Sequence, residues 1–296
     1  MSDIAIQVSG FRKDYGINTK PQAGLDELYL DLMKQCLTYS IWGESPETVE
    51  RYDIRSRFWR AIFPLFKRII SRTDILLLRR APFDPRTREE GRDHPLLAHT
   101  MIGLKRLDNI HQCIKSVIRS NVKGDLIETG VWRGGATIFM RAALKAYRVT
   151  DRKVWVADSF AGLPLPNADK YPADAGDIHH QIRHLAVSLE QVKDNFKKYS
   201  LLDEQVCFLK GWFKDVLPAA PIENLAILRL DGDMYESTMD ALKYLYPKLS
   251  RGGYVIVDDY GCLKGCKQAV HDFRSANGIT DEIKEIDWSG VYWQRS

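Results

Sequence analysis

Hydrophobic positions alternate regularly with polar ones from about Met101 to the end of the chain. Short apolar runs, bounded by turn-forming or acidic residues, predict strands at 125–128, 154–157, 206–209, 225–230 and 254–257. The segments between them predict helices at 136–147, 188–199, 236–248 and 265–276. Near-continuous apolar strands separated by helices are typical of a parallel sheet with helices on both faces. Two last strands without a helix between them, 283–286 and 291–293, predict a C-terminal antiparallel hairpin.

The first hundred residues follow a different pattern. Helical periodicity covers 28–37, and it covers 58–69 with one apolar face. Pro64 predicts a kink in this second helix, or its division into two short helices. The polar segment 85–94 predicts a loop.

Positive charge is concentrated in residues 51–92, where twelve Lys and Arg stand against five acids, while the whole chain carries +4. Arg60 and Lys67 lie opposite the apolar helical face. The segment is interpreted either as a helix packed on the domain or a second subunit, or as a basic amphipathic helix on a membrane surface or acidic partner. The first is favoured, because long Arg side chains commonly cover apolar surface. We divide the chain into an N-terminal helical lid or appendage, 1–99, with this basic insertion, and a main domain, 100–296.

Composition is that of an ordinary soluble protein, with 45% hydrophobic and 28% charged residues. Five scattered cysteines favour free thiols in a reducing compartment, and no apolar run reaches membrane-spanning length. A cytoplasmic location without a stable membrane span is therefore expected. Outside 51–92 the chain is net acidic, which disfavours nucleic-acid binding.

A glycine-rich turn follows the first strand of the main domain. Gly130, Gly134 and Gly135 lie where that strand gives way to a helix, whose N-terminus offers free N–H groups. The spacing is not the dinucleotide fingerprint, which disfavours a nicotinamide-dependent oxidoreductase. Glu128 would repel a pyrophosphate, and Asp158 ends the next strand where a ribose diol would lie. Both acids suit S-adenosylmethionine; the alternative is an ordinary β–turn–α with capping acids.

Three acids follow two other apolar strands. Asp231 comes directly after 225–230, and Asp258 and Asp259 come 27 and 28 residues later, after 254–257. If the two strands are neighbours, three like charges meet at the carboxyl edge of the sheet, which favours a divalent cation with oxygen ligands. Mg²⁺ there would hold a substrate hydroxyl and lower its pKa. The alternative is that these aspartates cap the next helices.

Long motifs resemble the metal-dependent macrocin-O-methyltransferase family, whose members methylate sugar hydroxyls in macrolide and aminocoumarin antibiotics. The resemblance covers roughly 94–296 and rests on Thr100–Asn109, Glu128–Gly135, Asp158–Pro164, Phe208–Phe213, Leu230–Thr238, Gly252–Tyr260 and Gly290–Trp293.

The resemblance implies a Rossmann-like class I fold that uses S-adenosylmethionine and Mg²⁺. It implies that Asp231, Asp258 and Asp259 bind the metal and that Asp231 is also the base, with Asp233 a weaker candidate ligand. The cofactor contacts that it implies are Thr100, Met101, Glu128, Thr129, Gly130, Gly134, Gly135, Asp158, Ser159, Gly211, Trp212 and Phe213. It also implies a homodimer or higher homo-oligomer with N-terminal helices over the active site, acting on a small, glycosylated molecule.

The chain departs from the family in residues 51–92, which are longer and more basic than the resemblance leads us to expect. The acceptor hydroxyl therefore stays open between a sugar, a phenol and another natural-product hydroxyl. A non-enzymatic membrane- or partner-binding module using 51–92 is the alternative of another class. His179 and His180 lie in the long loop after Asp158, either near substrate or in solvent.

Overall fold

The computed structural model describes residues 24–43, 46–48, 56–70, 72–73, 75, 77–80, 83–93 and 95–296. At 46–48, 60 and 80 only the backbone is described, and parts of the basic segment, 51–55 among them, lie outside the described residues. Within those described residues, no helix is long and apolar enough to cross a membrane.

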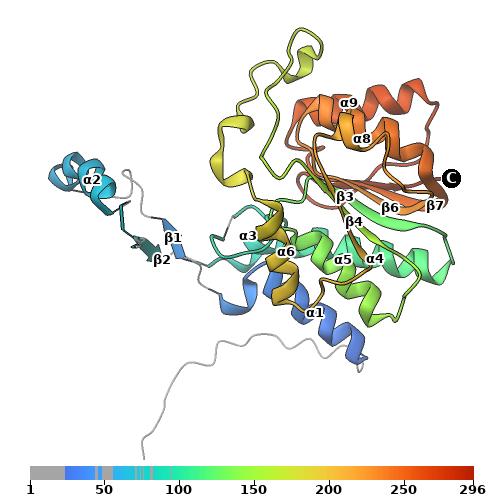
Figure 1. Cartoon of the computed structure of the whole chain (residues 1–296), viewed down its shortest axis with the longest axis horizontal. Coiled ribbons are helices and arrows are strands. Elements are labelled where there is room, and N and C mark those ends of the chain that lie inside the picture. Colours follow the sequence, from blue (N-terminus) through green and yellow to red (C-terminus); the bar gives the residue numbers. More distant parts are fainter. Residues whose placement is uncertain are drawn as a thin grey trace, which may run out of the picture.

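A seven-stranded sheet forms the centre of the molecule, in the order β5-β4-β3-β6-β7-β9-β8 (Figure 1). Its strands are β3 Asp125–Thr129, β4 Val154–Asp158, β5 Val206–Lys210, β6 Leu225–Leu230, β7 Leu249–Val257, β8 Lys284–Glu285 and β9 Val291–Gln294. The neighbouring strands β5, β4, β3, β6 and β7 pair in parallel, and β9 pairs antiparallel with both β7 and β8. The predicted parallel sheet and terminal antiparallel hairpin are confirmed. The chain reverses its order between β3 and β6, and ligands bind at the carboxyl ends of strands beside such a switch point.

Helices cover both faces of this sheet (Figure 1). One layer holds α1 Leu25–Leu37, α4 Leu104–Arg119, α5 Gly135–Ala146 and α6 Leu189–Lys198, and the other holds α7 Phe213–Val216, α8 Tyr235–Leu245 and α9 Lys264–Ala276. Leu126 packs into the first layer and Ile127 into the second, because successive strand residues face opposite sides. Leu30 and Leu37 of α1 are fully buried in the first layer, so this N-terminal helix is part of the core of the main domain.

Local capping explains where two of the helices begin. The Ser188 hydroxyl accepts the N–H of Gln191 at 3.2 Å, and α6 follows. The predicted loop at 85–94 is wrong in its first half, since α3 covers Pro85–Glu89. The Asp84 carboxylate caps this helix, and proline is suited to a first helical position.

A separate arm projects from the N-terminal part of the chain (Figure 1). Strand β1 Pro46–Thr48 pairs antiparallel with β2 Leu78–Arg80, and α2 Arg57–Ile70 lies between them in sequence. We call residues 46–80 the arm. One uninterrupted helix contains Pro64, so the predicted division into two helices is wrong.

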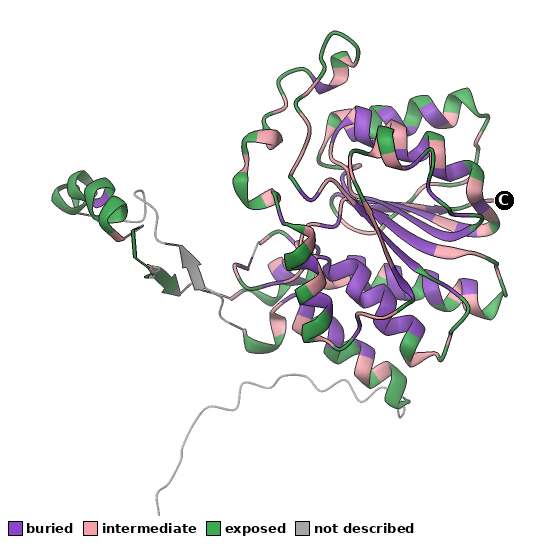
Figure 2. Cartoon of the chain, in the orientation of Figure 1, coloured by how far each residue is buried: buried purple, intermediate pink, exposed green. Residues whose placement is uncertain are grey.

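Of the two placements that the favoured interpretation gave for α2, packing on its own domain is not found (Figure 2), and packing on a second subunit stays a prediction. Of its described side chains only Phe63 is buried and Ile70 is half-buried, while its other large apolar side chains are exposed: Phe58, Trp59, Ile62, Leu65, Phe66 and Ile69. The β1–β2 ladder explains this exposure, because it holds the helix away from the sheet and its covering helices.

Candidate functional site

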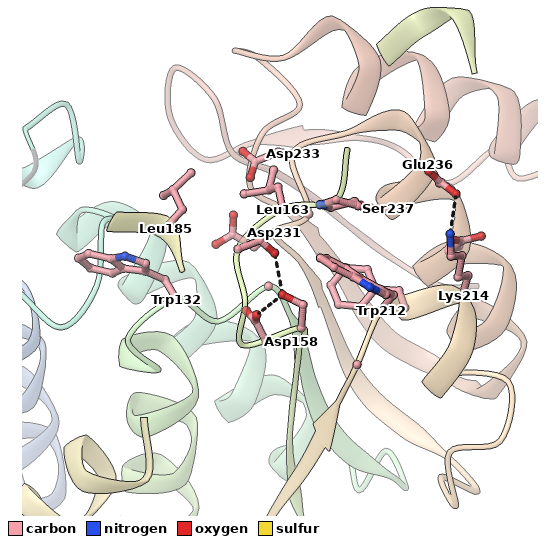
Figure 3. A pocket seen from close by; sticks show the side chains of 18 of the residues that line it. Trp132, Asp158, Leu163, Leu185, Trp212, Lys214, Asp231, Asp233, Glu236 and Ser237 are labelled. Atoms are coloured by element: carbon pink, nitrogen blue, oxygen red, sulfur yellow. Dashed lines mark hydrogen bonds and ion pairs between the residues drawn. The ribbon is translucent and has the colours of Figure 1, made fainter. Parts of the chain in front are cut away.

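A pocket of about 870 Å³, partly open to solvent, lies at the carboxyl ends of β3, β4 and β6. In Figure 3, Trp132 and Leu185 stand at one end of it and Lys214 and Glu236 at the other, with Asp158 and Asp231 between them. This is the place where the strand order predicts a ligand site.

The glycine turn after β3 lies close to the backbone of two other segments, the residue after β6 and the segment before α4. Gly130 has φ +85°, and a Cβ there would lie 1.7 Å from the carbonyl oxygen of Asp231. Gly134 has φ +84° at the N-cap of α5, and a Cβ on Gly135 would lie 2.4 Å from the carbonyl oxygen of His99. No other residue fits these approaches without displacing backbone, so the glycines are explained by packing as well as by ligand access.

Asp158, at the end of β4, accepts hydrogen bonds from the turns that follow β3 and β4 beside the pocket. Its carboxylate accepts the N–H groups of Val131 and Phe160, both at 2.7 Å. The Ser159 hydroxyl donates to the carbonyl oxygen of Gly162 at 2.6 Å. Burial raises the pKa of Asp158, and the two backbone N–H groups offset part of that effect. Both carboxylate oxygens therefore hold the loops while the residue lines the pocket.

The three predicted acids meet beside this pocket. Leu230 of β6 pairs with Val257 of β7, so the residues that follow these two strands emerge side by side. One oxygen each of Asp231, Asp258 and Asp259 lies within 4.8 Å of the others. The geometry expected from the sequence, with three carboxylates at one edge of the sheet, is present.

A buried arginine, missed by the sequence analysis, lies under the acids. The Arg229 side chain is fully buried in β6, and its guanidinium donates to Glu128, to Asp231 at 2.8 Å, and to Asp258. The available signal was an arginine inside an apolar strand, Ala226 to Leu230, since a fully buried cation needs acidic partners.

A second arginine reaches the same cluster from α4. Arg106 donates to Asp258 at 2.5 Å and to Asp287 at 2.8 Å. Asp258 therefore accepts an arginine on each carboxylate oxygen. The two guanidiniums compensate part of the negative charge of the cluster.

Burial and the neighbouring carboxylates raise the pKa values of several acids in and beside the cluster. Burial, followed by repulsion from Asp258, raises the pKa of Asp231 to about 6. Burial and Asp231 raise the pKa of Asp233 to about 7, and burial and Asp233 raise the pKa of Asp259 well above its ordinary value. Burial also raises the pKa of Glu128 to about 8, against the opposing effect of Arg229. Each raised pKa means that a further cation beside the cluster would stabilise the ionised carboxylates.

The donor set fits a hard divalent ion. All three side chains offer carboxylate oxygens, which Mg²⁺ prefers. Oδ2 of Asp231 is bound to Arg229, but its Oδ1 has no hydrogen-bond partner in the described part of the chain. Asp259 pairs with no Lys or Arg there, and its Oδ2 accepts only the N–H of Asp233, at 3.2 Å.

The predicted cofactor contacts fall into two groups. Those that line the pocket are Met101, Gly130, Asp158, Ser159, Gly211, Trp212 and Phe213. Those that do not line it are Thr100, Glu128, Thr129, Gly134 and Gly135, which lie among the buried or packed residues behind it. Lining residues that the sequence analysis missed are Trp132, Gly162, Leu163, Pro164, Leu185, Lys214, Gly232, Glu236, Ser237 and Asp240.

His179 faces the acid cluster from the long loop after β4, within the 3-10 turn His179–Gln181. Its Nδ1 lies 2.7 Å from Oδ2 of Asp177. Burial lowers the pKa of His179, but the bond to Asp177 and the charge of Asp233 outweigh it and leave the pKa raised. The loop thus brings the His179 imidazole under the influence of the Asp233 carboxylate, whereas Nδ1 of His180 has no partner among the described residues.

This sheet order, the glycine turn and the strand-end pocket are those of the class I methyltransferase fold. A family model described as Macrocin-O-methyltransferase (TylF) matches residues 26–295. The chain belongs to this family of O-methyltransferases.

Curated relatives agree in length as well as in sequence. The chain is 48% identical to the mycinamicin III 3''-O-methyltransferase of Micromonospora griseorubida, over 93% of this chain and 99% of that protein. It is 51% identical to the demethyldecarbamoylnovobiocin O-methyltransferase of Streptomyces niveus, over 91% and 94%.

Solved structures confirm the fold. The O-methyltransferase NovP is 49% identical, with a TM-score of 0.78 over 92% of this chain and 99% of that one. The calicheamicin methyltransferase CalS11, at 18% identity and a TM-score of 0.54, covers 84% of this chain and 98% of its own, and shares the fold alone.

Proposed function

We propose that this protein moves the methyl group of S-adenosylmethionine to a hydroxyl, in the first place a sugar hydroxyl, of a small natural product, and that it requires Mg²⁺. The observation that carries the proposal is the meeting of Asp231, Asp258 and Asp259 at the edge of a methyltransferase pocket. The activities for which the relatives are named, mycinamicin III 3''-O-methylation among them, support an acceptor of this kind.

The pocket offers separate places for the cofactor and the acceptor. In our proposal Asp158 and Ser159 hold the ribose and Trp212 and Phe213 hold the adenine, with Met101 near the methionine end. The acceptor enters at the opposite end, between Trp132 and Leu185, where apolar side chains would cover its less polar parts (Figure 3).

In the proposed reaction a new C–O bond forms as the S–CH₃ bond of the cofactor breaks, and S-adenosylhomocysteine leaves. Bound Mg²⁺ would supply Lewis acidity to the acceptor hydroxyl. Asp231, Asp258 and Asp259 would hold the ion, and a carboxylate would take the hydroxyl proton.

Asp231 is the proposed base, as predicted from the sequence, and Asp233 is its rival. Asp231 already accepts an arginine N–H, which lowers its basicity, whereas Asp233 lines the pocket with no arginine on its carboxylate in the described part of the chain. A D233N variant that loses turnover but keeps metal affinity would transfer the role to Asp233. A D233N variant with unchanged turnover would leave it with Asp231.

Three further features belong to the proposal. The protein acts as a homodimer or higher homo-oligomer in the cytoplasm, and it has neither a nucleic-acid partner nor a stable membrane span. Its N-terminal 99 residues contribute a lid, and the exposed apolar side chains of α2 support contact with another surface.

Calorimetry with S-adenosylhomocysteine tests the cofactor and chelation tests the metal. We expect binding in the micromolar range, and loss of methyl transfer in chelator that Mg²⁺ restores. No binding at millimolar cofactor would refute the methyltransferase proposal. Full turnover in chelator would refute the metal requirement alone.

A further inference from the structure

One guanidinium joins carboxylates from three adjacent strands at the edge of the sheet. Arg229, in β6, donates to Glu128 of β3, to Asp231 just after β6, and to Asp258 just after β7. None of its side chain is exposed, and Asp258 is only 6% exposed. Such a buried charge is stable only where its partners are fixed around it, so the four groups form one rigid unit.

The bonds within this unit and to Arg106 determine which carboxylate oxygens of Asp231 and Asp258 are occupied. Arg229 occupies Oδ2 of Asp231 and Oδ1 of Asp258, and Arg106 occupies Oδ2 of Asp258. Each carboxylate is therefore held at a set rotation, and Oδ1 of Asp231 stays unoccupied by any described donor. Groups that bond to metal ligands in this way orient them.

We propose that Arg229, anchored by Glu128, is a positioning residue of the metal site: it holds Asp231 and Asp258 in the orientation in which they bind a divalent cation. The inference rests on the proposed function, because it concerns the ion proposed there. It assigns Glu128 to the anchoring of Arg229, which agrees with its absence from the pocket lining.

Charge competition by Arg229 would change the metal affinity in the other direction. A guanidinium beside carboxylates also neutralises them, and a competing positive charge would weaken the binding of a metal. If charge competition dominates, removing Arg229 tightens metal binding. If positioning dominates, removing it weakens metal binding.

The test compares R229K, which keeps the charge but not the forked donor geometry, with R229Q, which loses both. Mn²⁺ affinity is measured by electron paramagnetic resonance without cofactor, and S-adenosylhomocysteine affinity is measured by calorimetry in chelator. We expect Mn²⁺ binding about 10- to 100-fold weaker in both variants, the range found for partners of metal ligands. Cofactor affinity should stay within about twofold, because Asp158 and the pocket walls are untouched.

Arg141 supplies the matched control. It is a buried arginine that donates to both oxygens of Asp203, at 2.8 and 2.6 Å, away from the acid cluster. R141K should lower the stability of the fold and leave Mn²⁺ affinity unchanged. Equal losses of Mn²⁺ affinity in R141K and R229K would mean general damage and would overturn the proposal.

E128Q keeps the test decisive if the Arg229 variants do not fold. It removes the anchoring charge and retains the shape of the side chain, so Mn²⁺ binding should weaken several-fold. Unchanged or tighter Mn²⁺ binding in E128Q, or tighter binding in R229Q, would overturn the proposal. Failure of the wild type to bind Mn²⁺ would instead refute the proposed metal requirement.

Discussion

The acid cluster and the arm are opposite kinds of structure within one chain. The acids lie at the ends of neighbouring strands, bonded through Arg229 and Arg106 to residues far away in sequence. The arm is joined to the domain through a short two-stranded ladder, and most of its helix is exposed. A site held from several elements tolerates little change, whereas a helix held at one end can vary in length and charge. Chemistry is therefore expected to reside in the cluster, and differences among acceptors in the arm and the loops.

The largest effect is expected from a change in the cluster. D258N removes one proposed ligand and leaves Arg229 and Arg106 with one carboxylate fewer between them. Methyl transfer at saturating cofactor should fall about 100-fold or more. The exposed Asp194 offers the control, since D194N should have wild-type turnover. A D258N variant with turnover within threefold of wild type would remove Asp258 from the site.

The cluster was predictable from the sequence, because two apolar strands that end in acid need only be neighbours for their acids to meet. The position of β6 beside β7 confirmed that condition. Arg229 was not predictable in the same way, since its partner Glu128 is 101 residues distant and becomes a neighbour only when β3 pairs with β6. A sequence pattern shows that a buried arginine needs acids, but the sheet order decides which acids.

Local patterns failed where tertiary geometry decided the outcome. Strand β7 begins at Leu249, five residues before the predicted strand, and its register with β6 shifts between Leu249 and Tyr254, where Gly252 and Gly253 lie. A Cβ on Gly253 would lie 2.8 Å from the carbonyl oxygen of Ser250 and 2.9 Å from that of Ala226, so that position needs glycine inside a strand. The exposure of α2 could likewise not be predicted from the sequence, because an amphipathic pattern predicts an apolar contact but does not identify the partner surface.

Substitutions in the core and in the arm should differ strongly in their effect on the free energy of unfolding. Leu228 is fully buried in β6, whereas Leu65 of α2 is 63% exposed. L228A should lower the free energy of unfolding by about 2–5 kcal/mol, and L65A by no more than about 0.5 kcal/mol. Urea denaturation of the two variants measures both. A loss above 2 kcal/mol in L65A would show that α2 is buried in solution, against its own domain or another copy.

Acid should weaken the domain through its buried histidines. Burial, reinforced by Lys34, lowers the pKa of His111 to about 4, and burial, reinforced by Lys198, lowers the pKa of His99 to about 4. Both values lie below the value of about 6.5 expected in the unfolded chain. The unfolded state therefore takes up protons first, so the stability is present above pH 6.5 and is lost as the pH falls towards 4.

The expected loss is about 1 kcal/mol per pH unit for each histidine. H111Q, which retains a polar group near the Tyr147 hydroxyl, should lose less stability than the wild type between pH 7 and pH 5. H184Q, at an exposed position, should follow the wild type. The free energy of unfolding from urea titrations at each pH is the measurement. Parallel pH profiles for H111Q and the wild type would contradict the assignment.

The smallest effect is expected when the arm is shortened. Thr48 pairs with Leu78, so an Asn-Gly turn in place of residues 49–77 closes the β1–β2 hairpin and removes α2. Affinities for S-adenosylhomocysteine and Mn²⁺ should stay within about twofold, because none of the arm residues that the structure describes lines the pocket or belongs to the acid cluster. The KM for the acceptor is then the quantity that reports on the arm, and a rise in KM at constant kcat would assign it to acceptor binding. A tenfold loss of cofactor affinity would mean that the arm supports the cofactor site, and the separation of the two regions would fail.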